Sequence, residues 1–465
     1  MAFENFRLVI LTTDILLYLL VACVVAFMWA GSRREYYVTA WRQIRSKQVP
    51  MVCLGILLVY VAVALLDSVH YQSRTLTGEK SPQTDDTGEA VYDSEILSLL
   101  DHLSVGLRDR TEKTFSTPFA TNQFTKELME REGAQVRDFP PLQHGGQHLV
   151  SISDRPSDIL TTGLSGLFSG LFWSLAIFAI YFIITTIRSK QVGDTYVRSP
   201  HVLRIVLFLA CIAIVAAILA TLSGKYHVLG TDQVGKDVLY RALKGCRVGL
   251  VVGTLTTLIA TPVAIAFGIA AGYFGGWVDD VIQYVYTTLS SIPNILLITA
   301  VMLIVTTRVS DEQTAIAADH RLVWLCVVLG IGSWTGLCRL LRGETLKVRE
   351  MEYIQASEAF GVSRIKIMFR HILPNVLHIV LITMILRFSG LVLAEAVLAY
   401  VGIGVDPSME SWGNMINAAR LEVARDPIVW WNLMAAFVFM IGLVLPANIF
   451  GDAVRDALDP RLRTE

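Results

Sequence analysis

Long apolar stretches recur along the chain, separated by mostly short polar segments. Crossing the roughly 30 Å hydrocarbon core of a bilayer takes about 20 mostly apolar helical residues, because a bare backbone finds no water there. Nine stretches meet this requirement, at residues 9–30, 49–66, 164–187, 202–222, 248–273, 281–305, 322–341, 376–405 and 429–450. The pattern predicts an all-α polytopic membrane protein. Asp14 lies inside the first stretch and no small-residue cleavage site follows it, so we expect a retained anchor.

One connection, residues 67–162, is long and polar. It holds nine Lys or Arg against sixteen Asp or Glu. Helical spacing and caps predict helices at residues 94–107 and 122–132, the second ended by Gly133. Gly, Ser and Pro predict flexible connections at residues 77–88 and 139–146. We expect a small, partly helical insert.

The distribution of basic residues predicts the orientation of the spans. Lys and Arg are retained on the cytoplasmic side of short loops. They gather between the first and second stretches and between the seventh and eighth, and both loops should therefore be cytoplasmic. With nine spans the N-terminus and the insert lie outside, and the C-terminus lies in the cytoplasm.

Composition narrows the class of protein further. The apolar fraction is 54%, the charged fraction 17%, and the mean hydropathy +0.54. The net charge is −1 and the pI about 6.8, so no basic field exists to hold nucleic acid. None of the six cysteines forms a CxxC pair, which gives no indication of a disulfide framework or a thiolate metal site.

Catalytic motifs are missing. The string GTDQVGKD at residues 230–237 matches the phosphate loop GxxxxGKS/T until its last position, where Asp237 replaces the hydroxyl that holds magnesium. His144 and His148 are four residues apart, but no third metal ligand lies nearby, and a solvated loop is the simpler interpretation. GxxxG pairs at Gly166 with Gly170 and at Gly268 with Gly272 predict close helix packing, within the chain or against another subunit.

The segment 350–378, EMEYIQASEAFGVSRIKIMFRHILPNVLH, predicts two short helices joined by a glycine turn. Apolar residues at Ala356, Ala359 and Phe360 suit one helix face, and Gly361 supplies a left-handed stop. Ser363 can cap a second helix whose apolar positions are Ile365, Met368, Phe369 and Ile372. Pro374 should end that helix. Such a unit between two spans suits docking into a groove of a soluble partner.

These residues carry a resemblance to a known family. Gln355-Ala356-Ser357, Gly361 and His371-Ile372-Leu373-Pro374 resemble the EAA loop of permease subunits in binding-protein-dependent ABC importers. HVLGTDQVGKDVLYRALKGCRVGL (227–250), SSIPNILL (290–297), EAVLAYVGIGV (395–405), SWGNMI (411–416) and ALDPRLR (457–463) are similar to the C-type permease subunit of dipeptide and oligopeptide importers. The resemblance covers about residues 202–465.

The resemblance implies an organisation. Residues 202–465 would form a six-helix type I importer permease core with the coupling loop at 350–376, in a bacterial inner membrane. Residues 1–66 and 163–201 would add three spans, with the external insert at 67–162 between them. The implied partners are a second permease, two ATPase subunits that hold ATP and Mg, an extracytoplasmic solute-binding protein and membrane lipid. This chain itself would bind no cofactor or metal and would not be an enzyme.

The resemblance also assigns residues to the ATPase contact. They are Gln355, Ala356, Ser357, Glu358, Gly361, Arg370, His371, Leu373 and Pro374. Gln355 stands where the family usually has Glu and Ser357 where it has the second Ala, which puts a charge-dependent contact at position 355 in doubt. Outside the loop, Lys236 replaces the usual Arg and Tyr240 the usual Ser.

Two further sets of residues are candidates for transport. Glu395 and Arg387 lie in the eighth stretch, where they either line the translocation path or fix helix packing. The same two alternatives hold for Asp14 in the first stretch. Ser411, Trp412 and Gly413 form an external segment that either closes the path or contacts the binding protein. Trp430 and Trp431 are expected to anchor the last span at the membrane interface.

The sequence leaves alternative functions open. A membrane scaffold or sensor could use the insert to bind a ligand, although such a role needs no ATPase dock. A related importer for nickel chelates shares the permease pattern. A membrane enzyme lacks any assembled site. Dipeptides, longer peptides and peptide-like solutes are all compatible with the sequence.

Overall fold

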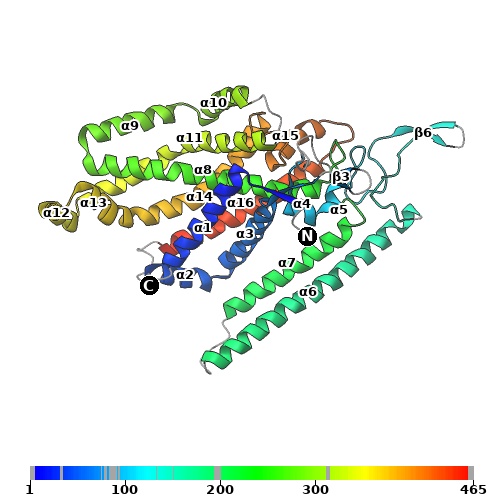
Figure 1. Ribbon diagram of the computed structural model, residues 1–465, viewed down its shortest axis with the longest axis horizontal. Coiled ribbons are helices and arrows are strands. Elements are labelled where there is room, and N and C mark those ends of the chain that lie inside the picture. Colours follow the sequence, from blue (N-terminus) through cyan, green and yellow to red (C-terminus); the bar gives the residue numbers. More distant parts are fainter. Residues whose placement is uncertain are drawn as a thin grey trace.

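Helices form wherever the chain is continuously apolar, and the computed structural model is a bundle of long helices with a small insert at one end (Figure 1). It describes residues 6–31, 35–74, 76–77, 81–82, 92, 95–131, 134–149, 151–192, 200–309 and 315–458. The basic positions Arg33, Arg34, Arg461 and Arg463, and the end of the ALDPRLR motif, lie outside the described residues.

The long helices are α1 (Thr12–Gly31), α3 (Gln48–Asp67), α6 (Arg155–Val192), α7 (Pro200–Ser223), α8 (Val238–Phe274), α9 (Gly276–Ser291), α10 (Asn294–Val309), α11 (Ala315–Arg349), α14 (Leu373–Tyr400) and α16 (Trp431–Leu458). The short helices are α2 (Glu35–Ser46), α4 (Leu99–Leu103), α5 (Val105–Arg108), α12 (Glu352–Ala359), α13 (Arg364–Ile367) and α15 (Trp412–Glu422), with a 3₁₀ turn at Ile152–Asp154 and a π turn at Met368–Ile372.

Each of the nine predicted stretches falls on helix, but they do not qualify equally as spans. Among the described residues, seven helices are long and apolar enough to cross a membrane, and α1 is a shorter candidate over Thr12–Ala26. The stretch predicted at 281–305 forms two helices, α9 and α10, that meet at a bend of 86°, so it is either a broken span or a re-entrant loop. Pro293 has no N–H to donate, and Ile292 before it is extended (φ −87°, ψ 127°), which breaks the helix between them.

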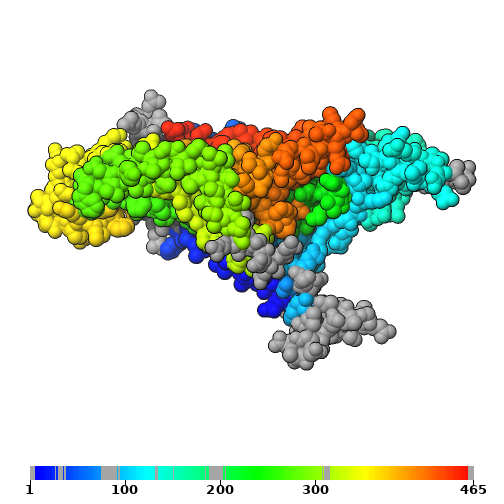
Figure 2. Space-filling view, turned by 90° about the horizontal axis from the view of Figure 1, so that it is seen from above, coloured from blue at the N-terminus to red at the C-terminus, as the bar shows by residue number. Residues whose placement is uncertain are grey.

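The bundle has two distinct ends (Figure 1). The insert lies at one end, and α12 and α13 project at the other, as Figure 2 also shows with the insert in cyan and α12 and α13 in yellow. Strand β1 (Phe6–Val9) lies at the insert end, where it pairs with the strand that follows α3. The end of α16 packs against α2, away from the insert.

The insert contains more strand than its sequence predicts. The strands are β2 (His70–Ser73), β3 (Leu76–Thr77), β4 (Ser81–Pro82), β5 (Leu97–Ser98), β6 (Glu127–Arg131) and β7 (Ala134–Asp138). Antiparallel pairing joins β1, β2 and β5 into one sheet, and forms two hairpins, β3–β4 and β6–β7.

The helix predicted at residues 122–132 is wrong, because this segment enters the β6–β7 hairpin. An isolated polar helix of this length is marginal, and pairing with β7 gives the backbone hydrogen bonds that an unpacked helix would share with water. Gly133, predicted as a helix stop, lies outside the described residues. The helix predicted at 94–107 is partly confirmed: Ser98 and Asp101 form a capping box at the start of α4.

Small residues allow the close helix pairs that the GxxxG motifs predict. A Cβ on Gly170 would lie 2.6 Å from Ile214 Cα, and one on Gly268 would lie 2.8 Å from Cys338 O. The first pair therefore joins α6 to α7 and the second joins α8 to α11. Both motifs serve packing within the chain.

Candidate functional site

The segment after α11 forms the predicted helix, glycine turn and helix. Gly361 N–H donates to Glu358 O at 2.9 Å, and Val362 N–H donates to Ser357 O at 3.1 Å. Gly361 lies in the left-handed region, with φ of +73°. This hydrogen-bond pattern is a Schellman C-cap, in which glycine avoids the strain of a Cβ. The predicted shape is confirmed.

Pro374 does not end the second helix, so that prediction is wrong. Leu373 N–H donates to Met368 O, a bond that spans five residues in the π turn Met368–Ile372. Proline in an α-helix clashes with the carbonyl four residues before it and donates no hydrogen bond. The wider π turn precedes Pro374, which lies in the first turn of α14. The chain thus passes from α13 into α14 without leaving the helix.

The segment of the two short helices packs against the bundle through buried side chains and presents apolar side chains to its surroundings. Ile354, Ile367 and Ile372 are fully buried against the ends of α8 and α11. Phe360 is 87% exposed, and Ile365 and Phe369 are also exposed. Of the predicted apolar positions only Ile372 is buried, and the anchoring residues Ile354 and Ile367 were not predicted. We name Phe360, Ile365 and Phe369 the tip patch.

The residues assigned by resemblance lie in the same chain segment as the tip patch. Those exposed to solvent are Gln355, Ala356, Glu358, Gly361, Arg370 and Pro374, whereas Ser357, His371 and Leu373 are half-buried. Glu358 accepts a hydrogen bond from the Tyr273 hydroxyl at 2.7 Å, which ties α12 to the end of α8. The Gln355 amide donates to Glu350 O at 3.4 Å.

Glu395 and Arg387 do not meet. Their positions are about 12 Å apart along α14 at 1.5 Å per residue. Glu395 is 2% exposed and faces α15, since a Cβ on Gly413 would lie 2.6 Å from its Oε1. Arg387 instead donates to Ser333 O of α11. Among the described residues Glu395 Oε1 has no hydrogen-bond partner.

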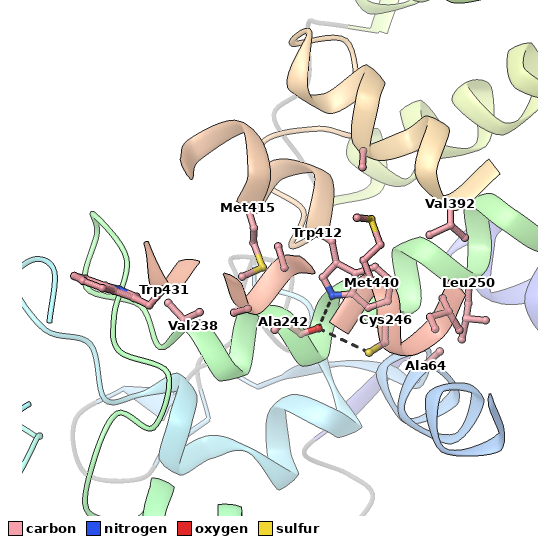
Figure 3. Close-up of a cluster of buried hydrophobic side chains, with 14 of the residues drawn as sticks. Ala64, Val238, Ala242, Cys246, Leu250, Val392, Trp412, Met415, Trp431 and Met440 are labelled. Carbon is pink, nitrogen blue, oxygen red and sulfur yellow. Dashed lines mark hydrogen bonds between the residues drawn. The ribbon is translucent and has the colours of Figure 1, made fainter. Parts of the chain in front are cut away.

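The segment Ser411, Trp412 and Gly413 is buried, so the exposed Trp412 side chain expected from the sequence is not found, and the choice between a gate and a binding-protein contact stays a prediction. Trp412 is 1% exposed, and its indole N–H donates to Ala242 O at 2.9 Å (Figure 3). Its ring lies against Gly245 and Gly249 of α8. These glycines form a GxxxG pair, the one sequence signal that could have predicted a close contact there.

Trp431 is buried as well, although a membrane-interface anchor was predicted. Its indole N–H donates to Thr231 O at 2.9 Å, and its ring centroid lies 5.0 Å from that of Phe124 in the insert. Phe115 of the insert packs on its other side at 6.4 Å. The neighbouring Trp430 is exposed, as an interfacial anchor requires. The insert therefore packs onto the start of α16.

A buried ion-pair cluster joins the insert to the loop between α7 and α8. His227 Nδ1 lies 2.8 Å from Asp237 Oδ2, and its Nε2 lies 3.4 Å from Glu112 Oε1. Glu112 also accepts three backbone N–H bonds from residues 143–145, at 2.7 to 3.3 Å. Part of the segment 139–146, predicted to be flexible, is thus held on this carboxylate.

The insert segment around Glu112 also covers the loop at residues 230–237 that resembles a phosphate loop. A Cβ on Gly235 would lie 1.7 Å from Glu112 O, so the insert backbone occupies the space above the loop.

The histidine pair His144 and His148 was considered as a metal site, and His148 bonds to Asp158 at 2.7 Å. Across the described part of the chain, no three His, Cys, Asp or Glu side chains come together as a metal site would need.

We predict that the stability of the chain falls at alkaline pH. Burial lowers the pKa of His227, but hydrogen bonds to Asp237 and Glu112 outweigh it and raise the pKa to about 9. Its charge therefore stabilises the fold fully below pH ~6.5, and this contribution, on the order of 3 kcal/mol, is lost as pH rises to about 9. Thermal unfolding in detergent between pH 6 and pH 10 measures it. His227→Gln should remove this alkaline decline; a decline that persists unchanged in the variant would contradict the assignment.

A second buried network ties α1 to the rest of the bundle. Arg247 Nη2 on α8 donates to Asp14 Oδ1 at 2.8 Å and to Thr13 Oγ1 at 2.7 Å. Asp319 of α11 accepts from Thr12 Oγ1 at 2.5 Å, and His70 Nδ1 lies 2.8 Å from Asp14 Oδ2. Asp14 is therefore held by polar contacts to Arg247 and His70, and these contacts make the first helix part of the bundle.

Known proteins resemble the second half of the chain. Residues 264–464, which include the tip patch, match the family described as binding-protein-dependent transport system inner membrane component. The oligopeptide transport system permease protein OppC of Mycobacterium bovis is 34% identical over 241 residues, covering 52% of this chain and 78% of that protein.

Two other relatives align over a similar length. The glutathione transport system permease protein GsiD of Pectobacterium atrosepticum is 32% identical over 239 residues, or 51% of this chain and 74% of that protein. The dipeptide transport system permease protein DppC of Bacillus subtilis is 30% identical over 237 residues, or 51% and 69%.

Proposed function

The chain belongs to the inner membrane components of binding-protein-dependent transport systems, and from this premise we propose that it is one permease subunit of an ATP-driven importer for peptides or peptide-like solutes. The relatives are named for oligopeptide, dipeptide and glutathione transport. These names do not favour an importer for nickel chelates, a scaffold or a sensor.

The tip patch is the observation that carries the proposal. An exposed phenylalanine and two neighbouring exposed apolar side chains at the end of a bundle mark an interaction surface. The buried isoleucines of α12 and α13 tie this surface to α8 and α11, so force on it reaches the long helices. We infer that an ATPase subunit docks there, and that Gln355, Ala356, Ser357, Glu358, Gly361, Arg370, His371, Leu373 and Pro374 shape the contact.

The rest of the importer lies on other chains. A second permease completes the translocation path, two ATPase subunits hold ATP and Mg, and a solute-binding protein delivers the substrate. ATP binding closes the ATPase subunits, the docked loops follow, and the helices alternate between inward-open and outward-open states. Each ligand drives a step only by binding one state more tightly than the other.

The proposed orientation follows from charge. Arg42, Arg45 and Lys47 lie around α2, and Arg364, Lys366 and Arg370 lie around α13, both away from the insert. Basic residues favour the cytoplasmic side. The tip patch and the C-terminus are therefore cytoplasmic in our proposal, and the N-terminus and the insert are outside.

Affinity purification tests the assembly. A C-terminal tag on the full chain, extraction in mild detergent and mass spectrometry should recover a second permease and ATPase subunits. Exchanging Phe360 and Phe369 for Ser should lose the ATPases and retain the permease, because only the tip patch changes. Retention of ATPases by this variant contradicts the proposed dock.

We expect Glu395→Gln to retain peptide uptake within about threefold. The Gln amide has nearly the shape of the carboxylate, and the burial of Glu395 against Gly413 supports a packing role. Uptake of radiolabelled peptide at matched expression measures this. A loss of tenfold or more, with the protein folded, would instead assign Glu395 to the path; Arg387→Gln provides the parallel comparison on the same helix.

A further inference from the structure

The insert carries a cavity of about 710 Å³ at its surface. The base of the β6–β7 hairpin, the start of α6 and the loop before α16 form its walls. Small-ligand sites typically measure roughly 300–1,000 Å³ and combine apolar walls with a few polar groups. Here Phe124, Phe139 and Ile152 supply apolar surface. The cavity is separate from the long helices of the predicted translocation path.

Three cations line this cavity: Lys126, Arg137 and Arg155. None of them forms an ion pair with a described residue, although the insert as a whole is acidic. Lys126 Nζ lies 5.2 Å from the centroid of the Phe139 ring, which holds it at the wall. Unpaired cations gathered on one cavity favour an anionic group as ligand, and guanidinium groups match a carboxylate well.

The lining also includes a negative charge, on Asp426, and a hydrogen-bond acceptor without a partner, on Gln123. Asp426, on the loop before α16, also lines the cavity and can attract an ammonium group. Gln123 is 7% exposed, and its side-chain oxygen has no hydrogen-bond partner among the described residues. A buried acceptor without a partner is costly, and an N–H of a ligand would satisfy it.

We propose that this cavity binds short peptides with free termini. The cations would hold the terminal carboxylate, Asp426 the terminal ammonium, and the phenylalanine rings an apolar side chain. A sphere of this volume is about 11 Å across, and an extended tripeptide is ~10 Å long. The inference rests on the proposed function, which supplies peptides as the class of ligand. It places a peptide-binding site outside the path through the helices.

Calorimetric titration of the full-length chain in detergent tests the proposal. The probes are trialanine, trialanine with an amidated C-terminus, N-acetyl trialanine and inorganic phosphate. We expect saturable binding of trialanine, at least tenfold weaker binding of the amide, and weaker binding of every charged probe in high salt. The double variant Arg137→Gln, Arg155→Gln should lose at least tenfold in trialanine affinity.

A matched control removes an exposed cation of the insert outside the cavity. Lys113→Gln should keep the wild-type affinity, since Lys113 pairs with Glu127 and does not line the cavity. Asp426→Asn should weaken trialanine more than the N-acetyl form, which lacks the ammonium. This comparison uses one variant against two ligands, so a general loss of folding cannot imitate it.

Three results would overturn the proposal: no saturable binding of trialanine, wild-type affinity in the double variant, or phosphate binding as tightly as trialanine. The importer proposal fails separately, because uptake is measured in cells. Uptake that continues in cells whose purified chain binds no peptide at this cavity overturns only the cavity site. Cavity binding by a chain that supports no uptake overturns only the importer.

Discussion

Replacing Gly361 by proline is expected to abolish peptide uptake, with a loss of at least tenfold. Gly361 has φ of +73°, whereas the proline ring fixes φ near −65°. Proline also removes the N–H that donates to Glu358 O at 2.9 Å. The turn between α12 and α13 would therefore change direction and carry Phe360 away from Ile365 and Phe369. The tip patch would no longer present one surface to an ATPase.

The matched control at this position is Gly361→Asn. Asparagine enters the left-handed region more readily than other residues with a Cβ, and nothing lies within 4 Å of a Cβ built here. Uptake of radiolabelled peptide and ATPase co-purification, both at matched membrane levels, should be lost in the proline variant and kept in the asparagine variant. Wild-type uptake by the proline variant would refute the role of the turn.

Replacing Arg247 by leucine is expected to destabilise the whole bundle, by about 3–5 kcal/mol. Arg247, Asp14 and Asp319 are almost fully buried, and Arg247 lies 2.8 Å from Asp14 and 3.7 Å from Asp319. Leucine would leave two buried carboxylates without their cation. Thermal unfolding in detergent and the amount of chain in the membrane should both decrease.

Neutralising the carboxylates provides the control. The triple variant Arg247→Leu, Asp14→Asn, Asp319→Asn removes the cation and both of its carboxylate partners together, and replacing a whole ion pair is often close to neutral. We expect it to recover part of the lost thermal stability. If the single variant unfolds like the wild type, or the triple variant is worse than the single, the buried ion pairs do not hold α1 to α8 and α11.

The sequence predicted some local features correctly, above all the glycine turn. Glycine at position 361 follows a short apolar helix, and its left-handed turn depends only on neighbours within five residues. The break at Ile292 and Pro293 was also visible in the sequence, because proline restricts the residue before it, yet the apolar run around it suggested a continuous span. The proline signal for a helix break thus competes with the apolar run that favours a continuous helix, and hydropathy alone does not decide between them.

Contacts between distant residues were not predictable in this way. The tryptophan at position 412 bonds to a residue 170 positions earlier, and the histidine at 227 lies between acids from two different segments. Whether an indole faces lipid, solvent or a pair of glycines depends on which helix lies beside it. The same holds for Glu395, whose neighbour is Gly413 and not Arg387.

By itself the sequence determined the helical membrane architecture, the glycine turn and the family, because bilayer thickness and backbone geometry act over short stretches of chain. Tertiary structure alone decided that the acidic insert is fixed to the bundle through Glu112, Phe115 and Phe124, and that Lys126, Arg137 and Arg155 line one cavity. The physical reason is that burial and ion pairing depend on the positions of many chain segments at once, and no single segment encodes them.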